Sequence, residues 1–156
     1  MKENDNLKPF KATNQDGEEF DSSTLIGKKP LVIYFYPKDF TPGCTKEACS
    51  FRDRYEEFRE LGAEVIGISS DSENSHKRFS NKYNLPFTLL SDKGGRLRKL
   101  FGVKKTLLGL IPGRETFIFD GDGKLILRFN SLNAEPHIRK AIKTLKDLKN
   151  DQSIST

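Results

Sequence analysis

Four stretches of the chain are almost unbroken runs of apolar residues and predict buried strands. PLVIYFY at 30–36, AEVIGISS at 63–70 and FTLLSD at 87–92 are rich in β-branched and aromatic side chains. Continuous runs of this kind are typical of strands that are covered on both faces of a sheet. The fourth stretch, ETFIFDGDGKLILRF at 115–129, predicts two strands around an Asp/Gly turn, and therefore an antiparallel hairpin.

Amphipathic segments lie between these strands and predict helices. The first helix is expected over 42–62, with Thr41 as a plausible N-cap and proline at its first position. A second helix is expected over 72–84, between a serine that can cap it and an asparagine that can end it. A short helix over 97–102 and a final helix over about 134–149 complete the pattern.

The order of these elements predicts an α/β fold. Residues 10–13 and 18–21 flank the turn NQDG and predict a small N-terminal β-hairpin. Strands joined through helices and followed by a hairpin give a mixed central β-sheet with helices on both faces. Thioredoxin-like folds share this plan, although the pattern alone does not single them out. With no repeat or linker, residues 1–156 are predicted to form a single domain with a frayed tail at 150–156.

The composition is that of a soluble globular protein. The chain has 156 residues, of which 35% are hydrophobic and 31% are charged, and no apolar run approaches the ~20 residues of a membrane span. We therefore expect no membrane insertion. The N-terminus MKENDNLKPF has neither an apolar signal core nor an Arg-rich, acid-poor composition, and this predicts a cytoplasmic location.

The net charge of +5 comes from 27 Lys and Arg against 22 Asp and Glu. In the densest basic region, IRKAIKTLKDLK, the lysines fall on one side of a predicted helix whose other side is apolar. That arrangement is typical of a solvated helix face. No nucleic-acid-binding motif accompanies the charge, so we expect no nucleic-acid partner.

The only two cysteines lie at the start of the helix predicted over 42–62. Cys44 falls in the first turn and belongs to the apolar stripe of that helix, whereas Cys49 does not. A thiol in the first turn faces unpaired backbone N–H groups and the positive end of the helix dipole, which favour the thiolate. The pattern therefore favours a reactive cysteine over a pair of inert core cysteines. The stripe consists of Cys44, Ala48, Phe51, Tyr55 and Phe58.

Other thiol chemistries fit the spacing less well. A thioredoxin-type exchange site needs two residues between its cysteines, and here there are four. A zinc site would need His76 and His137 as further ligands, and a Cys-His protease would need one of them as its base. We interpret His76 as a half-buried packing residue and His137 as a surface residue, and therefore expect no metal site.

The segments FYPKDFTPGCTKEAC and PGRETFIFD resemble the peroxiredoxin family, specifically its Q-type group, also called bacterioferritin comigratory proteins. The similarity runs from about residue 7 to residue 149. It implies a thioredoxin-like fold and the thiol-dependent reduction of hydrogen peroxide and organic hydroperoxides, without metal, haem or flavin. The segment KKTLLGLIP at 104–112 is more apolar than the resemblance leads us to expect, which leaves its role and the substrate preference open.

The same resemblance implies a role for five residues. Cys44 matches the peroxidatic cysteine, and Thr41 and Pro42 match the loop that surrounds it. Cys49 matches the resolving cysteine, and Arg114 matches the arginine that completes the pocket. The implied reductant is thioredoxin, with glutaredoxin as an alternative. Since there is no additional arm to exchange between copies, we expect a monomer.

Helix geometry sets a condition on any disulfide between these cysteines. Residues five apart on a helix are separated by about 8.7 Å between Cα atoms. A disulfide tolerates about 7 Å at most. The bond therefore requires the first turns of the helix to unwind. A thiol-disulfide oxidoreductase acting on proteins and a non-enzymatic redox sensor remain as alternative functions for the same two residues.

Overall fold

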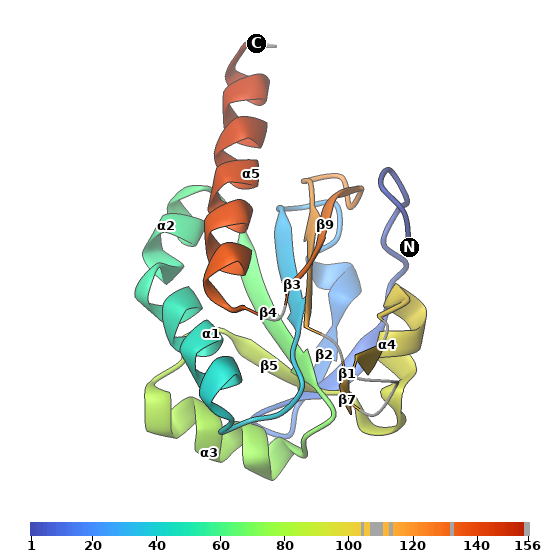
Figure 1. Ribbon diagram of the computed structural model, residues 1–156. Helices are drawn as coiled ribbons and strands as arrows, with labels where there is room; N and C mark the ends of the chain where they lie inside the picture. The colour runs from blue at the N-terminus through green and yellow to red at the C-terminus, as the bar shows by residue number, and fades with distance from the viewer. Residues whose placement is uncertain (104, 107–110, 113, 132, 155–156) are drawn as a thin grey trace.

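The computed structural model of the protein describes residues 1–156 except 104, 107–110, 113, 132 and 155–156 (Figure 1). Its centre is a seven-stranded sheet with the order β2-β1-β5-β4-β3-β8-β9. The strands are β1 (Lys11–Asn14), β2 (Glu19–Asp21), β3 (Leu31–Phe35), β4 (Glu64–Ser69), β5 (Thr88–Ser91), β8 (Glu115–Phe119) and β9 (Leu125–Asn130). The helices are α1 (Pro42–Asp53), α2 (Tyr55–Glu60), α3 (Glu73–Tyr83), α4 (Arg96–Phe101) and α5 (Glu135–Ile154), with short 3₁₀ turns at Ser22–Thr24 and Lys93–Gly95.

The sheet is mixed, as the sequence predicts. Strands β3, β4 and β5 are parallel and follow one another through helices, whereas β8 and β9 form the predicted antiparallel hairpin at one edge. The N-terminal hairpin of β1 and β2 joins the other edge through β5. Strands β8 and β3 pair antiparallel, with Glu115 opposite Phe35. This register places Arg114, which directly precedes Glu115, beside the loop that leads from β3 to α1.

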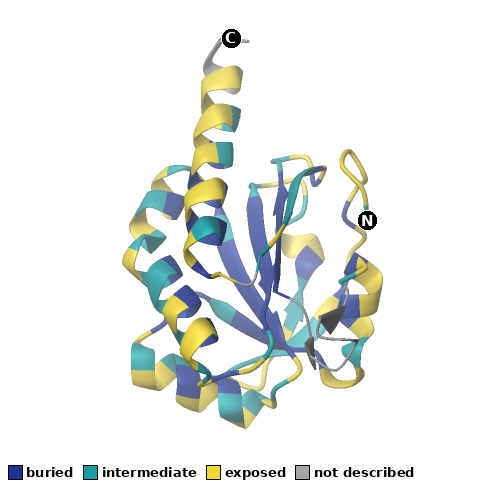
Figure 2. Ribbon diagram, viewed as in Figure 1, coloured by how far each residue is buried: buried dark blue, intermediate teal, exposed yellow. Residues whose placement is uncertain are grey.

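Two apolar cores lie on opposite faces of the sheet, and the strands between them are buried (Figure 2). Alternate residues of β3 point to the two faces, because successive side chains of a strand do so. Val32 and Tyr34 join the core under α1, α2, α3 and α5, whereas Ile33 and Phe35 join the core under α4 and the N-terminal segment. The predicted mixed sheet with helices on both faces is confirmed.

The helix predicted over 42–62 is divided. Helix α1 ends at Asp53 and α2 begins at Tyr55, because Arg54 has φ −111° and ψ 12°, outside the helical range. The backbone hydrogen bonds continue across the break, but those that involve Arg54 are long, at 3.3 Å. The break is therefore a kink that keeps the apolar stripe on the core. Gly62, at φ 78°, ends this region where the sequence predicts.

The other helices agree with the sequence apart from one end. Ser72 caps α3 by accepting a hydrogen bond from the Ser75 N–H, and Asn84 ends it in the left-handed conformation. Helix α5 continues to Ile154, beyond the expected end at Lys149. The single domain and the frayed tail at 150–156 stay predictions. Of the apolar segment 104–112, the structure describes only two paired strands, β6 (Lys105–Thr106) and β7 (Ile111–Pro112). No helix among the described residues has the length and apolar character that crossing a membrane requires.

Candidate active site

Cys44 is held at the N-terminal end of α1, against the core. Thr41 is the N-cap residue and Pro42 the first helical residue, as predicted, and the first intrahelical hydrogen bond runs from the Thr45 N–H to the Thr41 carbonyl at 2.9 Å. The N–H groups of the preceding turn have no partner within a helix. Cys44 is 1% exposed, so its thiol lies in a nearly dry place beside these donors.

Arg114 lies against the sulfur of Cys44. Its Nη2 donates a hydrogen bond to Cys44 Sγ at 3.3 Å, and its Nη1 donates to Glu47 Oε1 at 2.5 Å. Gly43 makes this approach possible, because a Cβ at that position would come within 3.1 Å of Nη2. Burial by itself would lower the pKa of Arg114, but Glu47 and Cys44 act in the opposite direction and the pKa is raised overall. The guanidinium therefore keeps its charge.

Glu47 is a site residue that the sequence reasoning missed. It lies one turn after Cys44, is fully buried and orients Arg114. Burial raises the pKa of Glu47 to about 8, although the charge of Arg114 opposes this shift. A signal was present in the sequence, because a residue three positions after Cys44 lies on nearly the same helix face and Glu is rarely buried without a partner.

His137 is buried, so its interpretation as a surface residue was wrong. The first turn of α5 packs the ring against β8, where Nδ1 lies 2.8 Å from Thr116 Oγ1 and Nε2 lies 2.8 Å from the Ser131 carbonyl oxygen. Since a carbonyl only accepts, Nε2 carries the proton and Nδ1 accepts from the Thr116 hydroxyl. Burial lowers the pKa of His137 to about 4. The ring, 3.9 Å from Glu47, is therefore neutral near pH 7.

A second buried arginine, Arg98 of α4, also lies near the site and was not predicted. It donates a hydrogen bond from Nη2 to the Tyr36 carbonyl at 2.8 Å, where β3 passes into the loop that leads to α1. Burial lowers the pKa of Arg98, whereas Asp92 and Cys44 act in the opposite direction. Two cations, Arg98 and Arg114, are thus close enough to the Cys44 thiol for their charges to interact with it.

The remaining predicted site residues lie on α1 or at its start. The Thr41 hydroxyl donates to the Lys38 carbonyl at 2.8 Å, so its side chain does not cap the helix although the residue is the N-cap. Pro42 is exposed, at the mouth of the turn that holds Cys44. Cys49 is half-buried, both cysteines are free, and α1 is wound across them.

His76 is fully buried, deeper than the half-buried position that the sequence suggested. Its Nδ1 lies 2.7 Å from Asp39 Oδ2 and its Nε2 lies 3.0 Å from the Leu90 carbonyl oxygen. His137 has different neighbours, Thr116 on β8 and Ser131 in the connection between β9 and α5. Among the described residues, the ring nitrogens of both histidines bond to oxygen atoms and not to a cysteine sulfur, so the geometry offers no support for the zinc site or the Cys-His protease weighed above.

Comparison with known families identifies the chain. Residues 4–128 match the model of the family described as AhpC/TSA. The chain belongs to this family. Within it, the chain is 52% identical to the chloroplastic peroxiredoxin Q of Sedum lineare over 142 residues, which cover 90% of this chain and 76% of that protein. It is 51% identical to the chloroplastic peroxiredoxin Q of Populus jackii over 140 residues, which cover 89% of this chain and 65% of that protein.

Solved structures place this AhpC/TSA member in the same Q-type group. The peroxidoxin BcpB of Mycobacterium tuberculosis matches with a TM-score of 0.87 and 39% identity, over 94% of this chain and 97% of that one. The bacterioferritin comigratory protein of Xanthomonas campestris matches with a TM-score of 0.81 and 32% identity, over 88% and 90%. The family, the thioredoxin-like fold and the enzyme class expected from the sequence are confirmed.

The prediction of a cytoplasmic location was wrong. The plant relatives that the chain matches are named as chloroplastic proteins, not as cytoplasmic ones. The chain spans about two thirds of the length of most of these relatives. The composition of its first residues therefore carries no information about the compartment.

The lowered pKa of His137 predicts a pH-dependent loss of stability. The ring stays neutral in the folded protein down to about pH 4, whereas it takes up a proton near pH 6.5 when unfolded. The contribution of His137 is thus complete above pH 6.5 and is lost as the pH falls toward 4, by up to about 3 kcal/mol in the free energy of unfolding.

This pH dependence can be measured by urea unfolding of the wild type and of His137→Asn between pH 4 and 7. The stability difference between the two proteins should shrink as the pH falls through this window. The raised pKa of Glu47 changes the stability with pH in the opposite sense, since the folded protein holds the proton of Glu47 up to about pH 8. This effect is common to both proteins, so it cancels to first order in their stability difference. A difference that is independent of pH would contradict the neutral state of His137.

Proposed function

We propose that the protein reduces hydrogen peroxide and organic hydroperoxides through Cys44, that Cys49 resolves the product as an intramolecular disulfide, and that thioredoxin recycles it. The observation that carries this proposal is the hydrogen bond of 3.3 Å from the Arg114 guanidinium to the sulfur of a buried cysteine in the first turn of a helix. A fixed cation and unpaired N–H groups at one thiol favour a thiolate and supply donors for an anionic transition state.

In the first step the Cys44 thiolate attacks one oxygen of the peroxide. An S–O bond forms, the O–O bond breaks, and the second oxygen leaves as hydroxide or alkoxide and takes up a proton. Negative charge then extends over the sulfur and both oxygens, so donors that face this line lower the barrier. Arg114 and the N–H groups of the first turn are in place for this role. The Thr41 hydroxyl is engaged with Lys38 and must turn from that carbonyl to donate to a peroxide.

In the second step the thiolate of Cys49 attacks the sulfur of the sulfenic acid on Cys44, an S–S bond forms, the S–O bond breaks, and hydroxide leaves and takes up a proton to become water. Both cysteines lie within the wound helix α1, where residues five apart are about 8.7 Å from each other between Cα atoms. A disulfide reaches about 7 Å at most, so α1 must lose its first turns before the bond can form.

The oxidised protein then needs an external dithiol to reduce the disulfide. Thioredoxin is the reductant that membership of the family supports, and glutaredoxin is the alternative. Each cycle uses two electrons from the dithiol and returns both cysteines to the free state in which the structure shows them. Because the two cysteines of one chain suffice for the cycle, the protein is proposed to act as a monomer.

Cysteine variants assign the two roles. Cys44→Ser should abolish peroxide consumption, because it removes the nucleophile. Cys49→Ser should retain one fast turnover and then stop with Cys44 as a sulfenic or over-oxidised acid. Stopped-flow peroxide consumption, with thioredoxin and its reductase as the recycling system, measures the rates, and mass spectrometry identifies the stalled form. Loss of the first turnover in Cys49→Ser would show that the roles are assigned wrongly.

Arg114→Met should slow the peroxide step by about two to three powers of ten, the usual loss when one oxyanion donor is removed. Methionine keeps much of the side-chain volume but offers no donor and no charge. Arg54→Met is a matched control, because Arg54 pairs with Glu57 at the surface, away from Cys44. The step is measured as the rate of Cys44 oxidation in single turnovers. An unchanged rate in Arg114→Met would remove this residue from the site.

Unwinding of α1 is measurable as a change in amide hydrogen exchange. Within residues 43–51, the reduced protein should protect the amides from Thr45 onward, because these are hydrogen-bonded within α1. The oxidised protein should lose protection over the same residues, since the disulfide cannot form across an intact helix. Helix α3 serves as an internal reference that should exchange alike in both states. Equal protection of residues 43–51 in the two forms would rule out this mechanism.

A further inference from the structure

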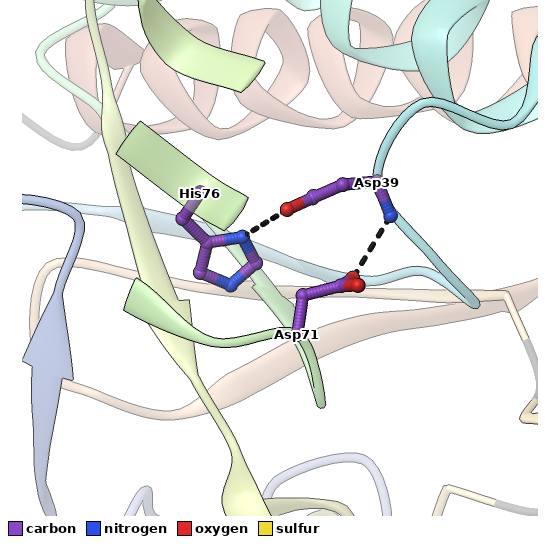
Figure 3. A group of neighbouring side chains, drawn as sticks. All are labelled: Asp39, Asp71 and His76. Carbon is purple, nitrogen blue, oxygen red and sulfur yellow. Dashed lines mark hydrogen bonds and ion pairs between the residues drawn. The ribbon is translucent and has the colours of Figure 1, made fainter. Parts of the chain in front are cut away.

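A cluster of buried polar side chains lies beside the loop that connects β3 to α1. Asp39 belongs to this loop, whereas His76 comes from α3 and Asp71 from the chain just before it (Figure 3). His76 is fully buried and Asp39 is almost so. The proposed chemistry does not use these residues, yet Asp39 precedes Cys44 by only five positions.

Asp39 is fixed by four hydrogen bonds. Its carboxylate accepts from the Tyr36 hydroxyl at 2.6 Å, from the Ser75 hydroxyl at 2.9 Å, and lies 2.7 Å from Nδ1 of His76. Its backbone N–H donates to Asp71 at 2.8 Å (Figure 3). Both the main chain and the side chain of this loop residue are therefore held to elements outside the loop.

The bonds of His76 show where its protons lie. Nε2 is 3.0 Å from the Leu90 carbonyl oxygen, which can only accept, so Nε2 carries a proton. Nδ1 faces the Asp39 carboxylate at 2.7 Å, and two lone pairs at that distance repel unless a proton lies between them. One proton on Nε2 and one shared between Nδ1 and the Asp39 carboxyl satisfy both contacts. The other titratable groups near the ring are Tyr36, Asp71 and Glu73, the last paired with Lys93.

The loop needs such a restraint because of its next residue. Phe40 has φ 65°, a left-handed conformation that non-glycine residues rarely adopt, and its side chain is 41% exposed. Its ring touches Phe79 of α3 at one edge, with 5.1 Å between ring centroids. Strained backbone of this kind persists only where the surroundings hold it. Asp39 provides that hold immediately before the strained residue, and Thr41 and α1 follow directly after it.

We propose that His76 is a positioning residue which, bonded through one ring nitrogen to Asp39 and through the other to Leu90, locks the β3–α1 loop and so keeps α1 wound around Cys44. The effect of this lock on catalysis depends on the proposed function. It favours the peroxide step, which needs the wound helix, and opposes the disulfide step, which needs the unwound one. Asp39, Asp71 and His76 could each offer a ligand atom to a cation, but their bonds to one another and to their neighbours account for them without one.

The test is to separate the two chemical steps in His76→Gln. A glutamine can donate to Asp39 or to Leu90 but cannot bridge the two as the ring does, so the loop should loosen. In a Cys49→Ser background the peroxide step should slow about tenfold, as small displacements of reacting groups do. In the protein with both cysteines, disulfide formation from the sulfenic acid should be as fast as in the wild type or faster. Ser80→Ala is the matched control on α3, since Ser80 bonds Leu85 and not Asp39.

A milder variant keeps the test valid if His76→Gln folds poorly. In Asp39→Asn the amide can donate to a neutral His76, so the peroxide step should slow less than in His76→Gln. Equal slowing of both steps in these variants, together with a lower melting temperature, would mean that His76 is only structural and would overturn the proposal. An unchanged peroxide step would overturn it as well.

Two measurements are independent of turnover. In the reduced protein, amide exchange of Asp39, whose N–H bonds Asp71, and of residues 45–48 in α1 should be faster in His76→Gln than in the wild type and Ser80→Ala, and equal exchange would contradict the lock. Nitrogen chemical shifts of His76 should show a proton on Nε2 and a hydrogen-bonded Nδ1, and a ring without a proton on Nε2 would contradict the pairing. If the wild type fails to oxidise Cys44 with peroxide, the proposed function fails, and these two measurements still decide whether the lock exists.

Discussion

The charge of Arg114, held between Glu47 and the sulfur of Cys44, is the interaction around which the site is arranged. A guanidinium taken out of water costs free energy unless its donors find acceptors, and here the Glu47 carboxyl group and the Cys44 sulfur provide them. The sheet supplies the position, because the pairing of β8 with β3 sets Glu115 opposite Phe35 and leaves Arg114 beside the start of α1. Gly43 then allows the approach to the sulfur.

The same interaction links the chemistry to the shape of α1. In the proposed cycle, the thiolate form of Cys44 attracts Arg114 and helps to hold the first turn of the helix in place. Attack on a peroxide converts the thiolate into a neutral sulfenic acid, and that attraction weakens. Oxidation of Cys44 in this cycle therefore lowers the free energy needed to unwind α1, at the moment when disulfide formation requires that unwinding. A permanent structural disulfide between Cys44 and Cys49 would not couple the unwinding of α1 to a chemical step.

Local patterns in the sequence predict the strands, the caps of α3 and the placement of Cys44, because each depends on residues close in the chain. The buried polar partners depend on contacts between distant elements. His137 is covered because α5 packs against Thr116, and His76 is covered because it faces Asp39, 37 positions earlier. Glu47 is the exception, since its place one turn after Cys44 was a local signal that a charged residue faces the core.

The unwinding that the proposed disulfide needs is confined to the start of α1, because contacts of Phe51 and Arg52 anchor the rest of the helix. Phe51 is fully buried and stacks on Tyr34, with 4.6 Å between ring centroids. The next residue, Arg52, donates a hydrogen bond to the Tyr83 carbonyl at the end of α3, at 2.7 Å. These contacts lie directly after Cys49, whereas Pro42 and Gly43 before Cys44 are exposed. The free energy of unwinding therefore rises steeply at Phe51, so the helix can open from its N-terminal end while the core beneath it stays packed.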